Sequence, residues 1–352
     1  MSTPAIASAS QGRHVFDVSL RPTLGSTFQP TGFPDLGAAT FERTVRAGDH
    51  VRKQPCLLVE SVQSMANRLE ETTWDASTQL PVAAVGGLPY IEIVNASGTF
   101  LSSSRLEAHR IFSAYVRDST WDGNPGDQVL LDKLGILPET PLDYRRMAQA
   151  ILAVDPLSLL HGVFFAGKTG RDGKRAAWPA QPRFTRAVSA VIEAHDVTEV
   201  ASGGRKSELV RHSLGDDVAS TGGTAEGYGS IPFHRTEFTA ADITASFVVD
   251  LDLLRSYGLP APATDLLETL ALWEIRSLLN GGLRLRTACD LELVDDTTIT
   301  DRRTHTPLPD LPDLTEQLTT HITAAAAYLG DGKAITVQWT PKPGKAKSNK
   351  AD

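Results

Sequence analysis

The chain has 352 residues and a net charge of −8, with 41% hydrophobic and 22% charged residues. This composition is that of a globular protein with a sizeable core, and no stretch approaches the roughly eighteen apolar residues that cross a membrane. The N-terminus lacks the basic and apolar regions of an export signal, and the only two cysteines, Cys56 and Cys289, lie far apart. We therefore expect a cytoplasmic protein without a disulfide framework or a cysteine-built zinc site.

The first part of the chain predicts one strand and one helix separated by loops. Residues 1–13 are rich in Ser and Ala and are expected to form a disordered leader. A strand is expected over 14–21, and the many prolines and glycines of 22–55 predict loops with at most a short hairpin. The pattern of 57–71 predicts an amphipathic helix whose apolar stripe is formed by Leu58, Val62, Met65 and Leu69.

The middle of the chain is less regular. We expect, in order, a strand over 88–94, a helix from a capping box at Ser104 and Glu107 to Arg117, a helix near 142–154, an apolar segment over 157–166, a helix near 185–195 and a glycine-rich stretch over 202–229. Residues 118–236 are interpreted as a region inserted into a single domain that spans 14–340.

The last part of the chain returns to clear patterns. We expect a buried strand over 243–253, a buried helix that Thr264 caps and Gly281 and Gly282 end, an alternating strand over 283–286, a helix over 314–329, a strand over 334–339 and a disordered lysine-rich tail over 341–352. The sequence contains no internal repeat.

Standard catalytic signatures are missing. Residues 204–207 imitate the end of a phosphate-binding loop, but Arg205 stands where a glycine should precede the lysine. Asp250 and Asp252 would suit a metal on one side of a strand, although a strand that leads into a polar loop is the simpler interpretation. Five histidines are expected to have core or surface roles without paired partners: His109, His161, His195, His212 and His234. We therefore predict no catalytic residue, no cofactor and no metal.

A basic run over 168–186 stands out in this acidic chain. It holds one anion, Asp172, so its charge is +5 and the rest of the chain carries −13. Flexible cations of this kind neutralise phosphates without exact geometry, and Trp178 and Phe184 would stack on bases. The alternative is a solvated loop beside core aromatics. The cations predicted to bind RNA are Lys168, Arg171, Lys174, Arg175, Arg183 and Arg186.

Two further groups of residues are predicted to bind RNA. The first is the loop of Gly281 and Gly282 with Arg284 and Arg286, which would share one strand face about 6.6 Å apart. Such glycines allow a phosphate to approach the backbone closely. The second is the polar face of the helix predicted over 57–71. This face carries Gln63, Ser64, Asn67 and Arg68.

Five segments resemble one CRISPR-associated family. They are LVESVQSMANRLE (58–70), SSSRLEAHR (102–110), RFTRAVSA (183–190), GSIPF (229–233) and GGLR (281–284). Over about residues 14–295 the chain is similar to the RAMP backbone subunit of type I-U (also called I-G) Cascade complexes.

The resemblance implies an α+β fold, a modified RNA-recognition (ferredoxin-like) RAMP palm with an inserted thumb and web region in 118–236. It implies a non-catalytic CRISPR RNA-binding subunit for antiviral defence, several copies of which stack along the guide and leave its bases free to pair with target DNA. The implied partners are CRISPR RNA, target DNA, further copies of the chain, the large subunit and the guide-processing end subunit of Cascade, and a transient nuclease-helicase.

Several alternatives stay open at this point. The thumb tip is either 168–175 or the glycine-rich 203–229, which carries Arg205, Lys206 and Arg211. A RAMP endonuclease would cleave target RNA with an acidic residue such as Asp172, which the neighbouring cations would keep ionised. A protein-only interaction domain would purify without RNA.

Overall fold

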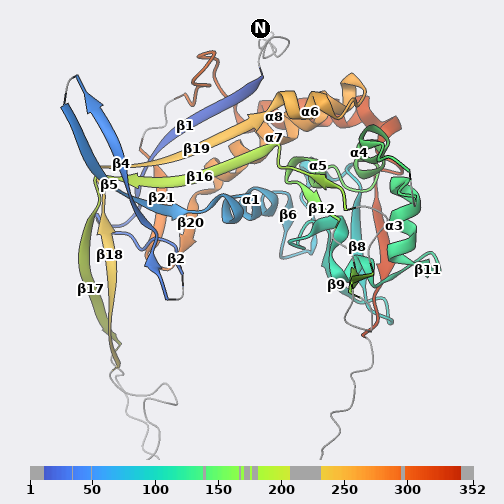
Figure 1. Ribbon diagram of the computed structural model, residues 1–352, viewed down its shortest axis with the longest axis horizontal. Helices are drawn as coiled ribbons and strands as arrows, with labels where there is room; N and C mark the ends of the chain where they lie inside the picture. Colours follow the sequence, from blue (N-terminus) through green and yellow to red (C-terminus); the bar gives the residue numbers. More distant parts are fainter. Residues whose placement is uncertain are drawn as a thin grey trace, which may run out of the picture.

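The computed structural model describes residues 12–33, 35–48, 50–137, 140–165, 168–169, 175–176, 181–206, 231–294 and 298–341. Its largest sheet is antiparallel and lies at the left of Figure 1, with helices above and beside it. The seven strands of this sheet follow the order β20 (Leu283–Arg286), β21 (Cys289–Leu293), β1 (Arg13–Pro22), β19 (Asp242–Asp250), β16 (Val188–His195), β5 (His50–Glu60) and β4 (Thr40–Ala47).

Alternating side chains decide which face of the large sheet is buried. β1 pairs with β19 from Arg13 opposite Asp250 to Leu20 opposite Ile243. Because successive side chains of a strand point to opposite faces, this register places the apolar residues of both strands on one face. The buried residues of β19 are Ile243, Ala245, Phe247 and Val249.

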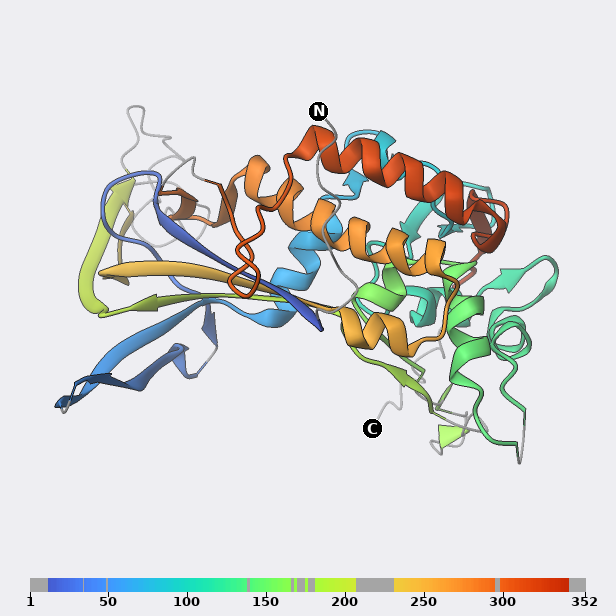
Figure 2. The ribbon, with the colours of Figure 1, turned by 90° about the horizontal axis from the view of Figure 1, so that it is seen from above.

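Two helices cover the apolar face. α1 (Val62–Glu71) packs against β16, and α7 (Ala261–Gly281) packs against β19 and α1. The chain order β1, α1, β16, β19, α7, β21 gives a β-α-β-β-α-β connectivity with these four strands in the spatial order 4-1-3-2. α8 (Leu311–Ala325) packs along α7, and Figure 2 shows the two helices side by side.

A second lobe is formed by residues between α1 and β16 and lies at the right of Figure 1. Its sheet has the strand order β11 (Asn124–Pro125), β10 (Thr120–Trp121), β22 (Ala334–Gln338), β8 (Tyr90–Val94) and β9 (Phe100–Ser103). β22 comes from the C-terminal part of the chain and pairs in parallel with β8. The helices of this lobe are α2 (Ala114–Arg117), α3 (Gly126–Leu134), α4 (Tyr144–Leu152) and α5 (Leu157–Leu160).

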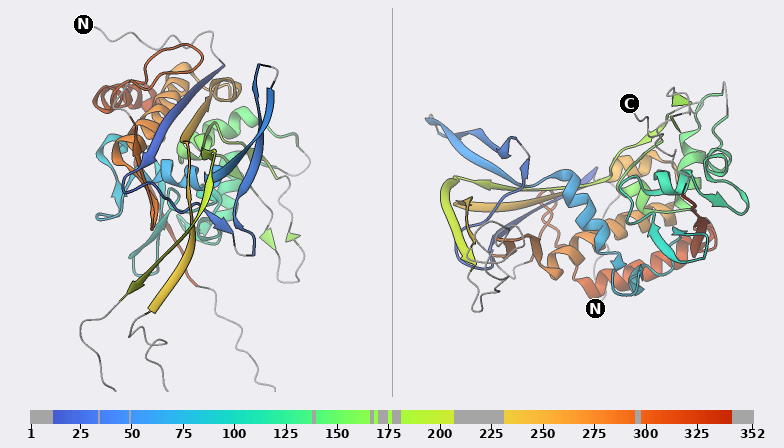
Figure 3. Two further views of the ribbon diagram at one scale, coloured as in Figure 1. Left: turned by 90° about the vertical axis from the view of Figure 1, so that its left-hand side faces the viewer. Right: turned by 90° about the horizontal axis from the view of Figure 1, so that it is seen from below.

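Short elements complete the described residues. α6 (Leu251–Ser256) connects β19 to α7. The two-stranded pairs are β2 (Gly32–Phe33) with β3 (Gly37–Ala38), β6 (Trp74–Asp75) with β7 (Leu80–Pro81), β12 (Val163–Phe164) with β15 (Arg183–Phe184), β13 (Lys168–Thr169) with β14 (Arg175–Ala176), and β17 (Thr198–Lys206) with β18 (Ile231–Thr239). The 3₁₀ helices are η1 (Ala83–Val85), η2 (Arg110–Phe112) and η3 (Ala326–Tyr328). Figure 3 shows the β4–β5 and β17–β18 hairpins extending from the large sheet in different directions.

Buried polar and charged side chains join the second lobe to the helices of the large sheet. Arg110 of η2 donates to both carboxylate oxygens of Glu70 on α1 at 2.6 Å each, and to the carbonyl of Gly162 at 2.9 Å. His161 contacts Glu274 of α7 at 2.9 Å, and both of these side chains are fully buried. Burial lowers the pKa of His161 to about 4 and raises the pKa of Glu274, so His161 is uncharged at neutral pH.

The helix predicted near 185–195 is wrong, because these residues form β16. Val188, Ala190, Ile192 and Ala194 are buried at every second position, which is the period of a strand. Alanine favours a helix, but pairing with β19 on one side and β5 on the other overrides that preference. β16 falls inside the predicted inserted region 118–236, so part of that region belongs to the large sheet.

Three other predictions of elements are wrong in part. The helix predicted over 57–71 begins only at Val62, because β5 continues before it and Ser61 caps the helix. The capping box at Ser104 and Glu107 starts no long helix: the Glu107 carboxylate instead accepts a bond from the Ser102 hydroxyl at 2.6 Å, and turns lead to η2 and α2. The loops predicted over 22–55 contain most of the long β4–β5 hairpin.

The remaining described elements are confirmed in type, with ends that shift by a few residues. They are the strands predicted over 14–21, 88–94, 243–253, 283–286 and 334–339, and the helices predicted over 142–154, 264–279 and 314–329. The strand predicted over 243–253 ends at Asp250, where α6 follows, and Thr264 is not a cap because α7 begins at Ala261. The predicted leader and tail lie almost entirely outside the described residues. Within those described, no helix is long and apolar enough to cross a membrane.

His14 is a buried histidine that links β1 to α7. Its ring nitrogens contact Asp301 and Glu268 at 2.9 Å each. Burial lowers the pKa of His14, but the two carboxylates outweigh this effect and the pKa is raised overall. The stabilisation from its charged form is therefore complete below the ordinary pKa of 6.5 and is lost as pH rises through the pKa of the folded state.

We expect His14→Gln to lower the free energy of unfolding more at about pH 5.5 than at about pH 9. Glutamine keeps hydrogen-bonding groups at this position but cannot carry the charge that the two carboxylates stabilise. Urea denaturation of both proteins at both pH values measures the difference, and an equal loss at the two pH values would contradict the assignment.

Candidate nucleic-acid interface

One buried carboxylate joins β5, α1 and β20. Glu60 at the end of β5 contacts Arg68 of α1 at 3.7 Å and forms an ion pair with Arg286 of β20. Arg68 also donates to the carbonyl of Leu285 at 2.6 Å, and Arg286 donates to that of Gln29 at 3.2 Å. We call Glu60, Arg68 and Arg286 the Glu60 cluster.

The Glu60 cluster carries more positive than negative charge. Its carboxylate is 2% exposed, whereas the side chains of Arg68 and Arg286 are 21% and 24% exposed. Because arginine stays protonated in proteins, one positive charge has no counterion within the cluster. A partly exposed guanidinium of this kind is suited to bind a phosphate.

Next to the cluster, α7 ends in an open glycine turn. Gly281 is the last helical residue, and Gly282 has φ 81° and ψ 161°, a conformation essentially restricted to glycine. Among the residues that the structure describes, apart from each glycine's chain neighbours and its own helix, no atom lies within 4 Å of where a Cβ would stand on either glycine. Both glycines are exposed, so a ligand can approach their backbone closely.

β20 shows the predicted alternation, with one difference. Leu283 and Leu285 are buried and Arg284 is exposed, as expected. Arg286 is instead half-buried against Glu60, and the pairing of β20 with β21 shifts register between the two arginines. Arg284 forms no ion pair with any described residue. The two arginines were predicted to share one strand face, but they have different surroundings.

The polar face of α1 lies beside this strand. Gln63 and Asn67 are exposed, Ser64 and Arg68 are half-buried, and the opposite face of the helix is buried. Because Arg68 reaches the backbone of β20, two groups of residues predicted separately form one surface. We call it the α1–β20 surface, formed by Gln63, Ser64, Asn67, Gly281, Gly282, Arg284 and the Glu60 cluster.

The basic run is only partly described. Lys168 and Arg175 lie in the short β13–β14 pair, whereas Arg171 and Lys174 lie outside the described residues, as does Asp172. Arg183 is exposed, with its guanidinium 4.6 Å from the centre of the Phe164 ring. Arg186 is half-buried, and burial lowers its pKa, with a further contribution from Arg110.

The aromatic residues beside the basic run have different outcomes. Trp178 lies outside the described residues. Phe184 is 4% exposed and packs against Tyr144 and Tyr257 at ring distances of 5.6 Å, so it belongs to the core and is not placed to stack on bases.

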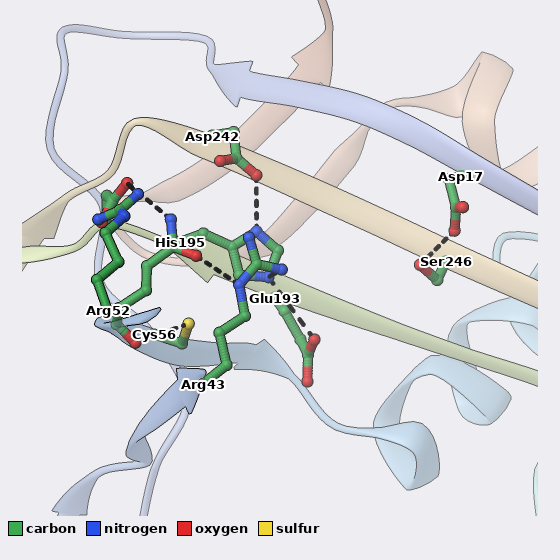
Figure 4. A network of polar contacts seen from close by, with 10 residues as sticks. Asp17, Arg43, Arg52, Cys56, Glu193, His195, Asp242 and Ser246 are labelled. Atoms are coloured by element: carbon green, nitrogen blue, oxygen red, sulfur yellow. Dashed lines mark hydrogen bonds and ion pairs between the residues drawn. The ribbon is translucent and has the colours of Figure 1, made fainter. Parts of the chain in front are cut away.

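A polar network on the opposite face of the large sheet escaped the sequence analysis. Figure 4 shows His195 of β16 between Asp242 of β19, at 2.7 Å, and Arg43 of β4, at 3.1 Å. These residues line a cavity of about 400 Å³ together with Asp17 and Arg302, which form an ion pair of 2.8 Å. No sequence signal pointed to this network, because its residues come from distant strands.

The prediction that the histidines have no partners is therefore wrong for His161 and His195, which contact Glu274 and Asp242. In the second pair, the chemistry of Arg43 fixes the tautomer. An arginine only donates hydrogen bonds, so the Nε2 atom of His195 accepts from Arg43 and the Nδ1 atom carries the hydrogen that binds Asp242.

His195 also lies opposite Cys56 of β5, but the two do not form a nucleophile and its base. The Cys56 thiol donates to the carbonyl of Gln54 at 3.4 Å, and burial raises its pKa. Both ring nitrogens of His195 are already occupied. A neutral buried thiol beside a histidine with no free nitrogen is not activated for attack.

The polar loop expected after the strand at Asp250 and Asp252 is wrong, because α6 follows β19 directly. Asp250 caps α6 by accepting from the Leu253 amide at 2.9 Å and pairs with Arg13, and Asp252 pairs with Arg255. The described part of the chain holds no group of three or more side chains placed to bind a metal.

Comparison with known proteins identifies the family. The family model described as CRISPR-associated protein GSU0053 (Cas_GSU0053) matches residues 15–199, which is more than half of the chain. The chain belongs to this CRISPR-associated family. It thus has a role in CRISPR defence.

A solved structure of a CRISPR complex has a distant likeness to the chain. Among solved structures, a chain of a "CRISPR RNA-guided surveillance complex, pre-nicking" is similar at 15% identity, over 79% of this chain and 73% of that one, with a TM-score of 0.32. No curated protein matches the chain.

We expect Arg286→Ala to lower the stability of the protein much more than Arg284→Ala. Arg286→Ala removes the closest partner of the buried Glu60 carboxylate and should lower the free energy of unfolding by about 2 kcal/mol. Arg284→Ala removes an exposed, unpaired side chain and should change it by less than about 0.5 kcal/mol. Urea denaturation measures both, and a loss of stability in Arg284→Ala as large as that in Arg286→Ala would contradict the roles given to them.

Proposed function

We propose that this CRISPR-associated protein is the RNA-binding backbone subunit of a type I-U (I-G) Cascade complex. In this role it polymerises along the guide, does not cleave it, and presents it for pairing with target DNA. The observation that carries the proposal is the α1–β20 surface. There, an excess of arginine over carboxylate, open glycine backbone and exposed amides meet on one side of α1.

The surface favours contacts to the sugar-phosphate backbone over base reading. Its donors are guanidinium, amide and backbone N–H groups, and it displays no exposed aromatic side chain among its residues. Phosphate contacts position a nucleic acid without reading its sequence. A guide held in this way keeps its bases free to pair, which is what a backbone subunit requires.

The connectivity of the large sheet supports the same proposal. The β-α-β-β-α-β unit corresponds to the ferredoxin-like palm that the sequence resemblance implies. β17 and β18 extend as a hairpin between its second and third strands, β16 and β19 (Figure 1). Residues 207–230, which join β17 to β18, and residues 170–174 lie outside the described residues, so the choice between 203–229 and 168–175 as the thumb tip stays a prediction.

We expect the chain, co-expressed with a CRISPR array, to purify with RNA of defined length. The absorbance ratio at 260 and 280 nm and a denaturing gel measure this. A spectrum of pure protein with no discrete RNA would favour a protein-only interaction domain and overturn the proposal.

We expect Arg284→Ala to weaken guide binding about equally for guides of different sequence. One lost phosphate contact should also reduce the slope of log affinity against log salt by about one. Gln338→Ala changes an exposed residue of the other sheet, away from the α1–β20 surface, and is the control that should bind like the wild type. A loss confined to particular guide sequences would indicate base reading instead.

The same preparations test for cleavage. With a complementary RNA target and Mg²⁺, the proposal predicts no product. A product that disappears with Asp172→Ala would establish the endonuclease alternative instead.

A further inference from the structure

β22 in the second lobe has one paired edge and one edge that is mostly open. It pairs with β8 along its whole length, from Ala334 opposite Tyr90 to Gln338 opposite Val94. On its other side, β10 meets it only at Gln338, which lies opposite Thr120. Four residues before that point, 334–337, therefore have no strand beside them on this edge within the described part of the chain.

The backbone directions of β22 can be assigned from one hydrogen bond. The amide of Trp339 donates to the carbonyl of Val94 in β8 at 2.8 Å. Because the direction of the backbone groups alternates along a strand, Ile335 and Val337 also point toward β8. Ala334 and Thr336 consequently direct their N–H and C=O groups toward the open edge.

A groove of about 510 Å³ runs along this open edge. One side is formed by Lys333 and the three consecutive β22 residues that follow it, 334–336, which is the pattern of a strand edge rather than a strand face. The other side includes Ala150 and Val154 at the end of α4, and Trp121 of β10, over whose ring the Lys133 ammonium lies at 5.1 Å. Apolar side chains and an open backbone edge thus face the same space.

The charges and hydrogen-bonding groups of the groove select its ligand. Lys133 and Lys333 are balanced by Asp122 and Asp331, so the groove offers a nucleic acid no net attraction. The edge also presents donors and acceptors in alternation, whereas phosphates only accept. A second polypeptide strand is the ligand whose own groups match that alternation.

We propose that the open edge of β22 binds an extended segment of another protein, which adds to the sheet as a further strand. The added strand lies in the groove, bonds with Ala334 and Thr336, and places alternate side chains against Ala150, Val154 and Trp121. Main-chain bonds supply affinity and the apolar side of the groove supplies selectivity. This site is independent of the α1–β20 surface.

Two substitutions at one residue test the main-chain bonds. Thr336→Pro removes the N–H that faces the open edge and places a ring there, while the bonds of Ile335 and Val337 to β8 remain possible. Thr336→Val is the matched control, because it removes the hydroxyl that bonds to Glu92 at 3.1 Å but keeps the N–H.

The probe is a peptide selected from a random twelve-residue phage library on the full-length protein, with affinity measured by fluorescence anisotropy. We expect Thr336→Val to bind it like the wild type and Thr336→Pro to bind it at least about tenfold more weakly, the effect of losing one well-made strand contact. Equal binding by Thr336→Pro and Thr336→Val would overturn the proposal, as would a library that yields no binder.

Hydrogen exchange provides a second measurement that does not depend on the proline variant folding. On adding the peptide, the amides of Ala334 and Thr336 should become protected, whereas those of Ile335 and Val337 should change little because β8 already binds them. Protection elsewhere in the chain without protection at these two amides would overturn the proposal.

Two further outcomes would identify a different occupant and also overturn the proposal. One is a peptide that binds only after residues 342–352 are removed, which would make the chain's own end the ligand of the edge. The other is a concentration-dependent dimer that Thr336→Pro abolishes, which would make a second copy of the chain the ligand of the edge. Guide RNA should still co-purify with Thr336→Pro, so failure at this edge is distinguishable from failure of the proposed RNA-binding function.

Discussion

The burial of the Glu60 carboxylate is the constraint on which the candidate interface depends. A buried carboxylate requires positive partners, and both of its partners are arginines from other elements, Arg68 on α1 and Arg286 on β20. Satisfying that one charge fixes the position of α1 relative to the strand that follows α7. The same contacts leave one positive charge in excess at the surface, so the interaction that holds the fold also prepares the site for an anion.

The second lobe is held to this frame by an ion pair and a buried hydrogen bond as well as by apolar packing. Arg110 and His161 come from the lobe, and their acidic partners, Glu70 and Glu274, come from the two helices that cover the large sheet. Bidentate geometry and full burial make such contacts directional, so they set the orientation of the lobe more narrowly than apolar contacts would. α1 therefore has two roles, with its exposed side at the proposed RNA surface and Glu70 at the junction between the lobes.

The two faces of the large sheet differ in what they can bind. One is covered by α1 and α7. On the other, acidic side chains have partners within the same face: Arg302 pairs with Asp17, and His195 donates to Asp242, the second contact being drawn in Figure 4. Paired charges leave little net attraction for a polyanion. The excess positive charge instead lies at the edge of the sheet, at β20, where glycines open the backbone.

The sequence by itself determined most elements, because strand alternation, helical periodicity and the glycine stop after α7 are local signals. It indicated a CRISPR-associated family through the resemblance of five segments, and the family model agrees. It also found the residues of the α1–β20 surface, though as two unrelated groups. Only the tertiary structure decided that 185–195 is a central strand, since pairing on both sides outweighs the helix preference of its alanines. It likewise decided that Arg286 supports Glu60 while Arg284 stays exposed, and that His14, His161 and His195 have acidic partners. Each of these outcomes depends on contacts between residues far apart in the chain, which no spacing in the sequence encodes.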